Sequence, residues 1–244
     1  MTRIQRAALL AACAALLAQA AFAGTPTAAS PAAQGLLSGG VVNTALALTL
    51  LAIIPSILIS MTSFIRIVIV LSMVRHAFGM PETPPNPVLI SLAMFLTVFT
   101  MGPAFAEINQ RAVEPLLAGT IDAPQAVEAA FGPLKTFMLS QVRDQDLQMI
   151  YEISRTPLPA TPEEVDIWKL TPAFMLNELR IAFSIGFVIM LPFLLIDLVV
   201  ASILLALGMM MVPPATISLP IKLLMFVLID GWTLIVQGVL GGFG

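Results

Sequence analysis

The stretch Pro192–Pro220 reads PFLLIDLVVASILLALGMMMVPPATISLP, and it decides the fold of this chain. It contains an apolar helix with an aspartate inside it, then a glycine, three consecutive methionines and two prolines. A second apolar helix begins at Pro220 after a charge-free turn. The pattern predicts a helical hairpin whose tip carries flexible thioethers where a soluble protein would carry polar loop residues. We therefore expect the tip to contact lipid, a partner subunit or the wall of a narrow passage.

The composition is that of a membrane or membrane-assembly protein. Of the 244 residues, 59% are hydrophobic and only 10% are charged, whereas about a quarter of the residues in soluble domains are charged. The net charge is −3 and the basic residues are scattered, which argues against a nucleic-acid-binding surface. One cysteine and one histidine are too few for a disulfide framework or a Cys/His metal site, and no cofactor is expected.

Residues 1–23 have the pattern of a secretory signal peptide. Arg3 and Arg6 precede an apolar segment, and Ala21 and Ala23 are the small residues of a cleavage site. The apolar segment 7–20 is shorter than the roughly 20 residues that cross a bilayer, so an uncleaved span fits less well. A lipoprotein signal ending at Cys13 would have an even shorter apolar core. We expect cleavage after Ala23 and a periplasmic N-terminus in the mature chain.

Two segments follow the signal peptide. Residues 24–40 are rich in Ala, Pro, Ser, Thr and Gly, which is typical of a flexible linker. Residues 41–106 predict a first apolar hairpin, since two apolar segments flank the proline-rich turn GMPETPPNP. Arg75 at this turn places it on the cytoplasmic side by the positive-inside rule.

Residues 107–171 are expected to form a small helical domain in the periplasm. Ten acidic and five basic residues between positions 107 and 170 give this segment a net charge of −5. Apolar residues recur with helical spacing along 131–151. A capping residue followed by proline predicts a short helix that starts at Thr161 and a long helix that runs from Pro172 after a cap at Thr171. We expect the charges of this domain to form a solvated face.

Residues 172–244 predict the second apolar hairpin. Its turn holds a methionine-rich tip with a glycine and two prolines beside it: Gly208, Met209, Met210, Met211, Pro213 and Pro214. Charges lie inside or near the apolar segments of both hairpins: Arg66, Glu178, Arg180, Asp197, Lys222 and Asp230. A charge that faces lipid at mid-membrane costs roughly 2.5–3.5 kcal/mol. We therefore expect these residues to stabilise the assembly by pairing within the chain or with a neighbouring subunit, and a tight oligomer is favoured over a four-span monomer.

Two chemical alternatives arise from the second hairpin, and neither is favoured. Asp197 and Asp230 are equally far from a hairpin centre at 213.5, a spacing that suits an aspartyl protease or a proton relay. However, the residues around Asp230 lack the Gly-x-Gly-Asp motif of such proteases, so capping or pairing is the preferred role. Three successive methionines cannot converge on one metal ion from a helix, and a packing role suits them better.

Several segments resemble the flagellar biosynthetic protein FliP family. Pro172–Phe187 (PAFMLNELRIAFSIGF) is similar to its first signature, and Pro192–Met209 is similar to its second. Met61–Ile67, Val212–Pro220 and Asp230–Trp232 also resemble the family. The similarity extends over essentially the whole chain after the signal peptide. Asn177 and Ser184 depart from the family pattern, which puts a local contact between subunits in doubt.

The resemblance implies a core subunit of the flagellar type III export gate, and not an enzyme. In that family the subunit forms a pentamer, which FliR completes and FliQ surrounds, with FlhB alongside; unfolded export substrates pass through the centre. The helices of the family bend into a conical stack largely above the bilayer. Its methionine-rich loop closes the channel, and this loop corresponds here to Met209, Met210 and Met211. The implied location is the bacterial inner membrane, within the flagellar basal body.

The predicted fold class is an all-α membrane protein with two long kinked helical hairpins. A small helical periplasmic domain lies between them, and the subunits assemble as an oligomeric helical export gate. The equivalent subunit of a virulence-type injectisome is the main alternative; the signal peptide and the Val-Pro-Pro after the methionines favour the flagellar branch. A small-molecule permease would usually have repeated halves, and an intramembrane enzyme would need convergent catalytic groups. The sequence indicates neither.

Overall fold

The computed structural model describes residues 48–49, 52, 55–57, 59–80 and 82–243. The chain divides into two units, Met1–Ile59 and Ser60–Gly244. In the first unit, the described residues are helical. The expected signal peptide with Ala21 and Ala23, the expected linker at 24–40 and the first residues of the expected hairpin lie outside the described residues. The elements below all belong to the second unit.

All regular elements of the second unit are helices, and its described residues contain no strand. This confirms the all-α class. The elements are α3 (Phe64–Ala77), α4 (Asn86–Thr100), α5 (Gly102–Ile108), η3 (Asn109–Val113), α6 (Glu114–Leu117), α7 (Ala123–Gln141), α8 (Asp144–Ile153), η4 (Pro162–Glu164), α9 (Ile167–Ala206), α10 (Pro214–Leu228), α11 (Gly231–Leu240) and η5 (Gly241–Phe243).

Helices α3 and α4 are joined by the proline-rich turn that the sequence predicts. Arg75 at the end of α3 stabilises this turn, since its guanidinium donates to the Asn86 side chain at 2.5 Å. The second apolar segment of the expected first hairpin extends to residue 106, whereas α4 ends at Thr100 and the chain bends by 68° into α5 at Gly102-Pro103. The break follows from Pro103, which has no N–H to continue the ladder of α4.

The segment 107–171 folds into helices, as expected, and the helix expected at Thr161 is present but short. Helix α7 begins with a capping box in which the Asp122 carboxylate accepts from the Gln125 N–H at 3.0 Å. The pattern at Thr161 gives only the three-residue 3₁₀ turn η4, and the Thr161 side chain makes no capping hydrogen bond.

Helix α9 is 40 residues long and starts five residues earlier than the sequence analysis expected. Its N-cap is Asp166, whose carboxylate accepts from the Trp168 N–H at 3.0 Å. Thr171 is therefore inside the helix, where its hydroxyl donates to the Ile167 carbonyl at 2.8 Å. Pro172 and Pro192 are also accommodated within α9.

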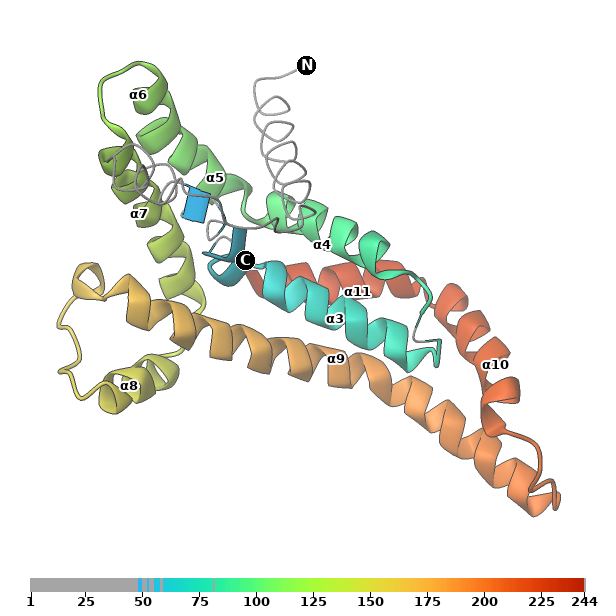
Figure 1. Cartoon of the computed structure of the whole chain (residues 1–244). Coiled ribbons are helices and arrows are strands. Elements are labelled where there is room, and N and C mark those ends of the chain that lie inside the picture. Colours follow the sequence, from blue (N-terminus) through green and yellow to red (C-terminus); the bar gives the residue numbers. More distant parts are fainter. Residues whose placement is uncertain (1–47, 50–51, 53–54, 58, 81, 244) are drawn as a thin grey trace, which may run out of the picture. The chain divides into compact units, whose positions relative to one another are not determined.

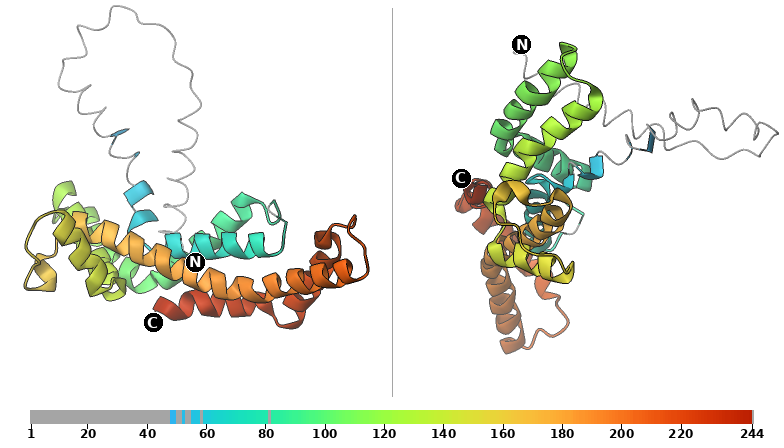
Figure 2. Two further views of the ribbon diagram at one scale, coloured as in Figure 1. Left: turned by 90° about the horizontal axis from the view of Figure 1, so that it is seen from below. Right: turned by 90° about the vertical axis from the view of Figure 1, so that its left-hand side faces the viewer.

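The core of the unit lies where α3 packs against α9 and the two last helices (Figures 1 and 2). Three phenylalanines from three elements meet in it: the Phe78 ring centroid is 5.2 Å from that of Phe193 and 4.8 Å from that of Phe226. Gly186 of α9 lies so near α3 that a Cβ there would be 2.3 Å from the sulfur of Met73. The close approach of α3 and α9 positions the side chains of the candidate functional site.

The second hairpin consists of α9, the methionine-rich turn, α10 and α11. The return arm is not one helix, since α10 and α11 meet at a bend of 68°. By length and composition, α9 can cross a membrane, and the described residues contain up to three candidate spans if the α4–α6 pair and the α10–α11 pair each count as one. Four spans were expected; part of the first lies outside the described residues.

Candidate functional site

The tip of the second hairpin holds three methionines on a well-defined turn. Gly208 has φ +74°, a left-handed conformation that glycine adopts without steric cost. Its N–H donates to the Leu205 carbonyl at 3.0 Å, and the next N–H, that of Met209, donates to the Leu204 carbonyl at 2.9 Å. These two bonds form a Schellman motif, which ends α9 at a fixed residue. The turn is therefore set by backbone bonding, and the methionine side chains are left to contact something else.

The methionine side chains point away from the rest of the unit. Their exposed fractions rise along the turn, from 44% at Met209 to 75% at Met210 and 95% at Met211. Pro213 then caps α10, and Pro214 is its first residue. No charged residue occurs between Asp197 and Lys222, so the tip is an uncharged surface of flexible thioethers.

Below the tip, Lys222 of α10 and Asp197 of α9 form an ion pair. The Lys222 ammonium donates to the Asp197 carboxylate at 2.6 Å and to the Ala77 carbonyl of α3 at 3.1 Å. The Lys222 side chain is only 6% exposed, whereas that of Asp197 is 41% exposed. This pair ties both helices of the hairpin to the end of α3, and so fixes the direction in which the tip projects.

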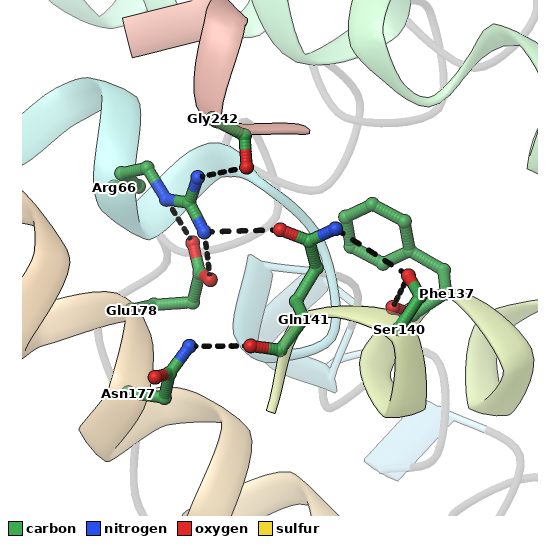
Figure 3. A network of polar contacts seen from close by, with 7 residues as sticks. All are labelled: Arg66, Phe137, Ser140, Gln141, Asn177, Glu178 and Gly242. Atoms are coloured by element: carbon green, nitrogen blue, oxygen red, sulfur yellow. Dashed lines mark hydrogen bonds and ion pairs between the residues drawn. The ribbon is translucent and has the colours of Figure 1, made fainter. Parts of the chain in front are cut away.

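Farther from the tip, α3 and α9 share a second ion pair, which is fully buried. The Arg66 guanidinium donates to both oxygens of the Glu178 carboxylate, through Nε at 2.7 Å and through Nη2. The same guanidinium donates to the Gln141 side chain at 3.3 Å and to the Gly242 carbonyl at 3.1 Å (Figure 3). Four elements thus meet at one arginine, whose charge and donors are satisfied away from water.

Two neighbours of Glu178 on α9 bind other elements. Arg180 donates to both carboxylate oxygens of Asp146 in α8, at 2.7 and 2.8 Å. The Asn177 amide donates to the Gln141 carbonyl at the end of α7, at 2.8 Å. Glu178 and Arg180 face different directions because they are two residues apart on a helix. One segment of α9 therefore holds α3, α7 and α8.

Asp230 differs from the other five charges. It occupies the bend between α10 and α11 with φ +50°, and it makes no side-chain capping bond. The expectation that Asp230 and Asp197 lie at one level of the hairpin was wrong. The residue of the return arm that meets Asp197 is Lys222, and the midpoint of that pair is at 209.5, within the methionines.

Sequence reasoning missed two partners in this set, Asp146 and Gln141. Asp146 was assigned to a solvated face, yet its side chain is 4% exposed. A signal for it existed, since Asp146 precedes Ile150 by four residues and so lies on the apolar stripe of its helix. For Gln141 we find no comparable signal.

The described residues contain no cluster of three or more His, Cys, Asp or Glu side chains that could hold a metal ion. One hollow of the unit, about 460 Å³, is lined by Met73, Arg180, Phe183, Ser184 and Phe187. Both polar side chains of this lining already have partners, since Arg180 is bound to Asp146 and the Ser184 hydroxyl donates to the Arg180 carbonyl. The hollow therefore offers packing surface and no set of reactive groups.

Comparison with known proteins gives the family of this chain. The FliP family matches residues 47–239. The chain belongs to the FliP family. The flagellar biosynthetic protein FliP of Caulobacter vibrioides is 52% identical over 196 residues, which cover 80% of this chain and 74% of the relative. The FliP protein of Bacillus subtilis is 48% identical over 198 residues, covering 81% and 90%. The match to the FliP family includes the tip and all six charges, and FliP proteins are not enzymes.

Proposed function

We propose that this chain is a channel subunit of the flagellar type III export apparatus, and that its methionine tip seals the channel. Family membership supports the export apparatus as the setting. The observation that carries the sealing role is the tip itself: Met209, Met210 and Met211 project from a rigid turn with no charge nearby.

The chemistry of the tip suits a deformable seal. Methionine is unbranched and flexible, so its side chains fill irregular gaps and move aside without breaking hydrogen bonds. A ring of such side chains from several subunits excludes water and hence ions, as hydrophobic constrictions do in other channels. Gly208, Pro213 and Pro214 keep the backbone of the turn fixed, while the side chains remain free to yield to a passing unfolded chain.

A seal of this kind requires several copies of the tip around one axis. We propose a homo-oligomer, a pentamer by analogy with the family, with FliR, FliQ and FlhB as further partners. The outer faces of the hairpin support this, because large apolar residues near the tip are exposed in the single chain: Ile203, Leu205, Leu207 and Ile217. Burial of such a surface against neighbouring subunits removes apolar area from water or lipid and favours assembly.

The proposed location is the bacterial inner membrane, in the flagellar basal body, after cleavage of a signal peptide at Ala23. The segment 107–171 is then a periplasmic domain. Both proposals rest on sequence patterns, namely the signal-like residues 1–23 and the position of Arg75 at the first turn.

The seal is tested by replacing Met209, Met210 and Met211 together with alanine in cells that assemble the apparatus. Alanine keeps the turn apolar but removes the flexible volume, so we expect ion leak across the inner membrane to rise while secretion of flagellar substrates persists. Membrane-potential dyes measure the leak, and secreted filament proteins measure export. A leak equal to that of the wild-type chain would contradict the seal.

Two controls accompany this experiment. Met94→Ala with Met149→Ala removes two methionines that are also exposed, by 46% and 37%, but lie outside the tip; we expect no leak. Expression of the wild-type chain in a flagellated bacterium that lacks its own FliP should restore filament secretion. Restoration of injectisome secretion alone would favour the virulence-type alternative.

A further inference from the structure

Gly242 and Phe243 bind the Arg66 site, although they lie 176 or more positions from it in the sequence. The Arg66 guanidinium donates to the Gly242 carbonyl at 3.1 Å. Its Cζ atom lies 3.7 Å from the centroid of the Phe243 ring, within the range of a cation–π contact. The Phe243 ring also stacks on Phe137 of α7, with centroids 6.2 Å apart and planes at 25°. Two successive residues thus contact the same buried guanidinium, Gly242 through its carbonyl and Phe243 through its ring.

Elements other than this segment also hold Arg66 in place. Nε and Nη2 of Arg66 are held by Glu178 of α9, and Nη2 also contacts Gln141 of α7 (Figure 3). The guanidinium is planar and presents its donors in a fixed fork, so these bonds leave Nη1 aimed at the Gly242 carbonyl. Arg66 itself is fully buried.

The geometry also explains why residue 242 is glycine. A Cβ built at Gly242 would lie 2.9 Å from Nη1 of Arg66, too close for the present arrangement. A Cβ at the neighbouring Gly241 meets nothing within 4 Å. Adjacent glycines therefore differ in their tolerance of a methyl group, and only Gly242 is constrained by the Arg66 site.

We propose that Gly242 and Phe243 form an anchor that holds α11 on the Arg66 site and couples the return arm, α10–α11, to α7. The arm is then fixed at two points. Lys222 holds α10 through Asp197 and Ala77, and the anchor holds the far end of α11 beyond the bend at Asp230. Arg66 contacts both the anchor and Gln141 of α7, and Phe137 of α7 stacks on Phe243, so loosening the anchor loosens the end of α7 as well. This inference goes beyond the proposed seal and does not depend on it.

Hydrogen–deuterium exchange of the purified full-length protein in detergent tests the anchor. We expect Gly242→Ala and Phe243→Ala to raise amide exchange about tenfold across residues 231–243 and at the end of α7, since local opening becomes easier when charge-assisted and ring contacts are lost. Gly241→Ala is the matched control and should exchange like the wild-type protein. Phe243→Tyr keeps the ring and should restore the wild-type rates.

The outcomes separate the parts of the proposal. Equal exchange in Gly242→Ala and Gly241→Ala, together with no effect of Phe243→Ala, would overturn the anchor. Faster exchange confined to residues 241–243, with α7 unchanged, would overturn the coupling. If Gly242→Ala does not fold, the comparison of Phe243→Ala with Phe243→Tyr decides the question, and wild-type exchange in both variants refutes the anchor.

Discussion

At the scale of single residues, the ion pair between Lys222 and Asp197 illustrates how a charge is held inside an apolar hairpin. The two partners are not equivalent: the Lys222 side chain is almost fully buried, while Asp197 retains an exposed side. A buried ammonium that loses its counterion bears the full desolvation penalty, whereas a half-exposed carboxylate can turn toward solvent. The pair is therefore expected to respond asymmetrically to removal of either partner.

Asp197→Asn should destabilise the protein more than Lys222→Met does. We expect a loss of about 2–3 kcal/mol in the free energy of unfolding for Asp197→Asn, and about 1 kcal/mol for Lys222→Met. Unfolding in detergent by denaturant measures both values. Ser202→Ala, on the same helix, removes only a hydroxyl bonded to its own backbone and serves as the control. A larger loss for Lys222→Met than for Asp197→Asn would contradict this account.

The six charges also show what could and could not be predicted about single residues from the sequence. Each of the six could be singled out, because a charge in an apolar segment is costly without a partner. Their partners could not be assigned, since Arg66 and Glu178 are 112 positions apart and nothing local connects them. Five of the six charges find partners within this chain, so these five do not by themselves demand a neighbouring subunit.

At the scale of elements, apolar periodicity predicted that the helices exist, but it did not predict where they end. Two residues can cap the same helix, and the structure uses only one of them. Asp166 and Thr171 both precede residues that can start α9. The earlier one caps the helix, and Thr171 then bonds back to the turn that contains it. Pro172 is the sixth residue of α9, and the helix continues through it. A rule based on the proline alone would have placed a helix boundary at this position.

The bend between α10 and α11 was not predicted as a bend, although its residues resembled the FliP family. It requires Gly231, because a Cβ there would lie 2.1 Å from the ring of Phe226, which is locked among Phe78, Phe193 and Trp232. We expect Gly231→Ala to lower the free energy of unfolding by about 1–3 kcal/mol through overpacking.

Gly238 in the same helix provides the comparison for this prediction. A Cβ at Gly238 meets nothing within 4 Å, so Gly238→Ala should be neutral or stabilise by about 0.5–1 kcal/mol, as expected for alanine within a helix. Thermal unfolding of both variants in the same detergent gives the difference. If Gly231→Ala is as stable as Gly238→Ala, the ring of Phe226 does not determine the bend.

At the scale of the whole molecule, the second unit combines a buried polar junction with a largely apolar exterior. Helix α4 buries Leu89, Ala93 and Thr97 and exposes larger side chains such as Phe95 and Phe99. Such exteriors belong against lipid or other subunits. Composition alone predicted an apolar exterior. Which helix face contacts which neighbour depends on packing between segments that are distant in the sequence, so the periodicity of one segment does not reveal it.

The proposed orientation of the whole chain in the membrane can be tested directly. The segment 107–171 is proposed to be periplasmic and the turn after α3 cytoplasmic, so exposed residues in the two places should differ in access. In a Cys13→Ser background, Leu117→Cys should react in intact cells with a maleimide that crosses the outer but not the inner membrane. Glu82→Cys should react only after the inner membrane is permeabilised. Both should react equally in detergent, which controls for local accessibility.

This experiment also discriminates between a chain that crosses the bilayer and one whose helices stand largely above it. In the second arrangement the turn at Glu82 and the segment around Leu117 can share one aqueous side despite the apolar helices between them. Equal reaction of both cysteines in intact cells would therefore contradict a crossing by the bent pair that α4 forms with the elements α5 to α6. Protection of Glu82→Cys alone would support it, because α4 and the elements up to α6 are the only part of the chain between the two labels.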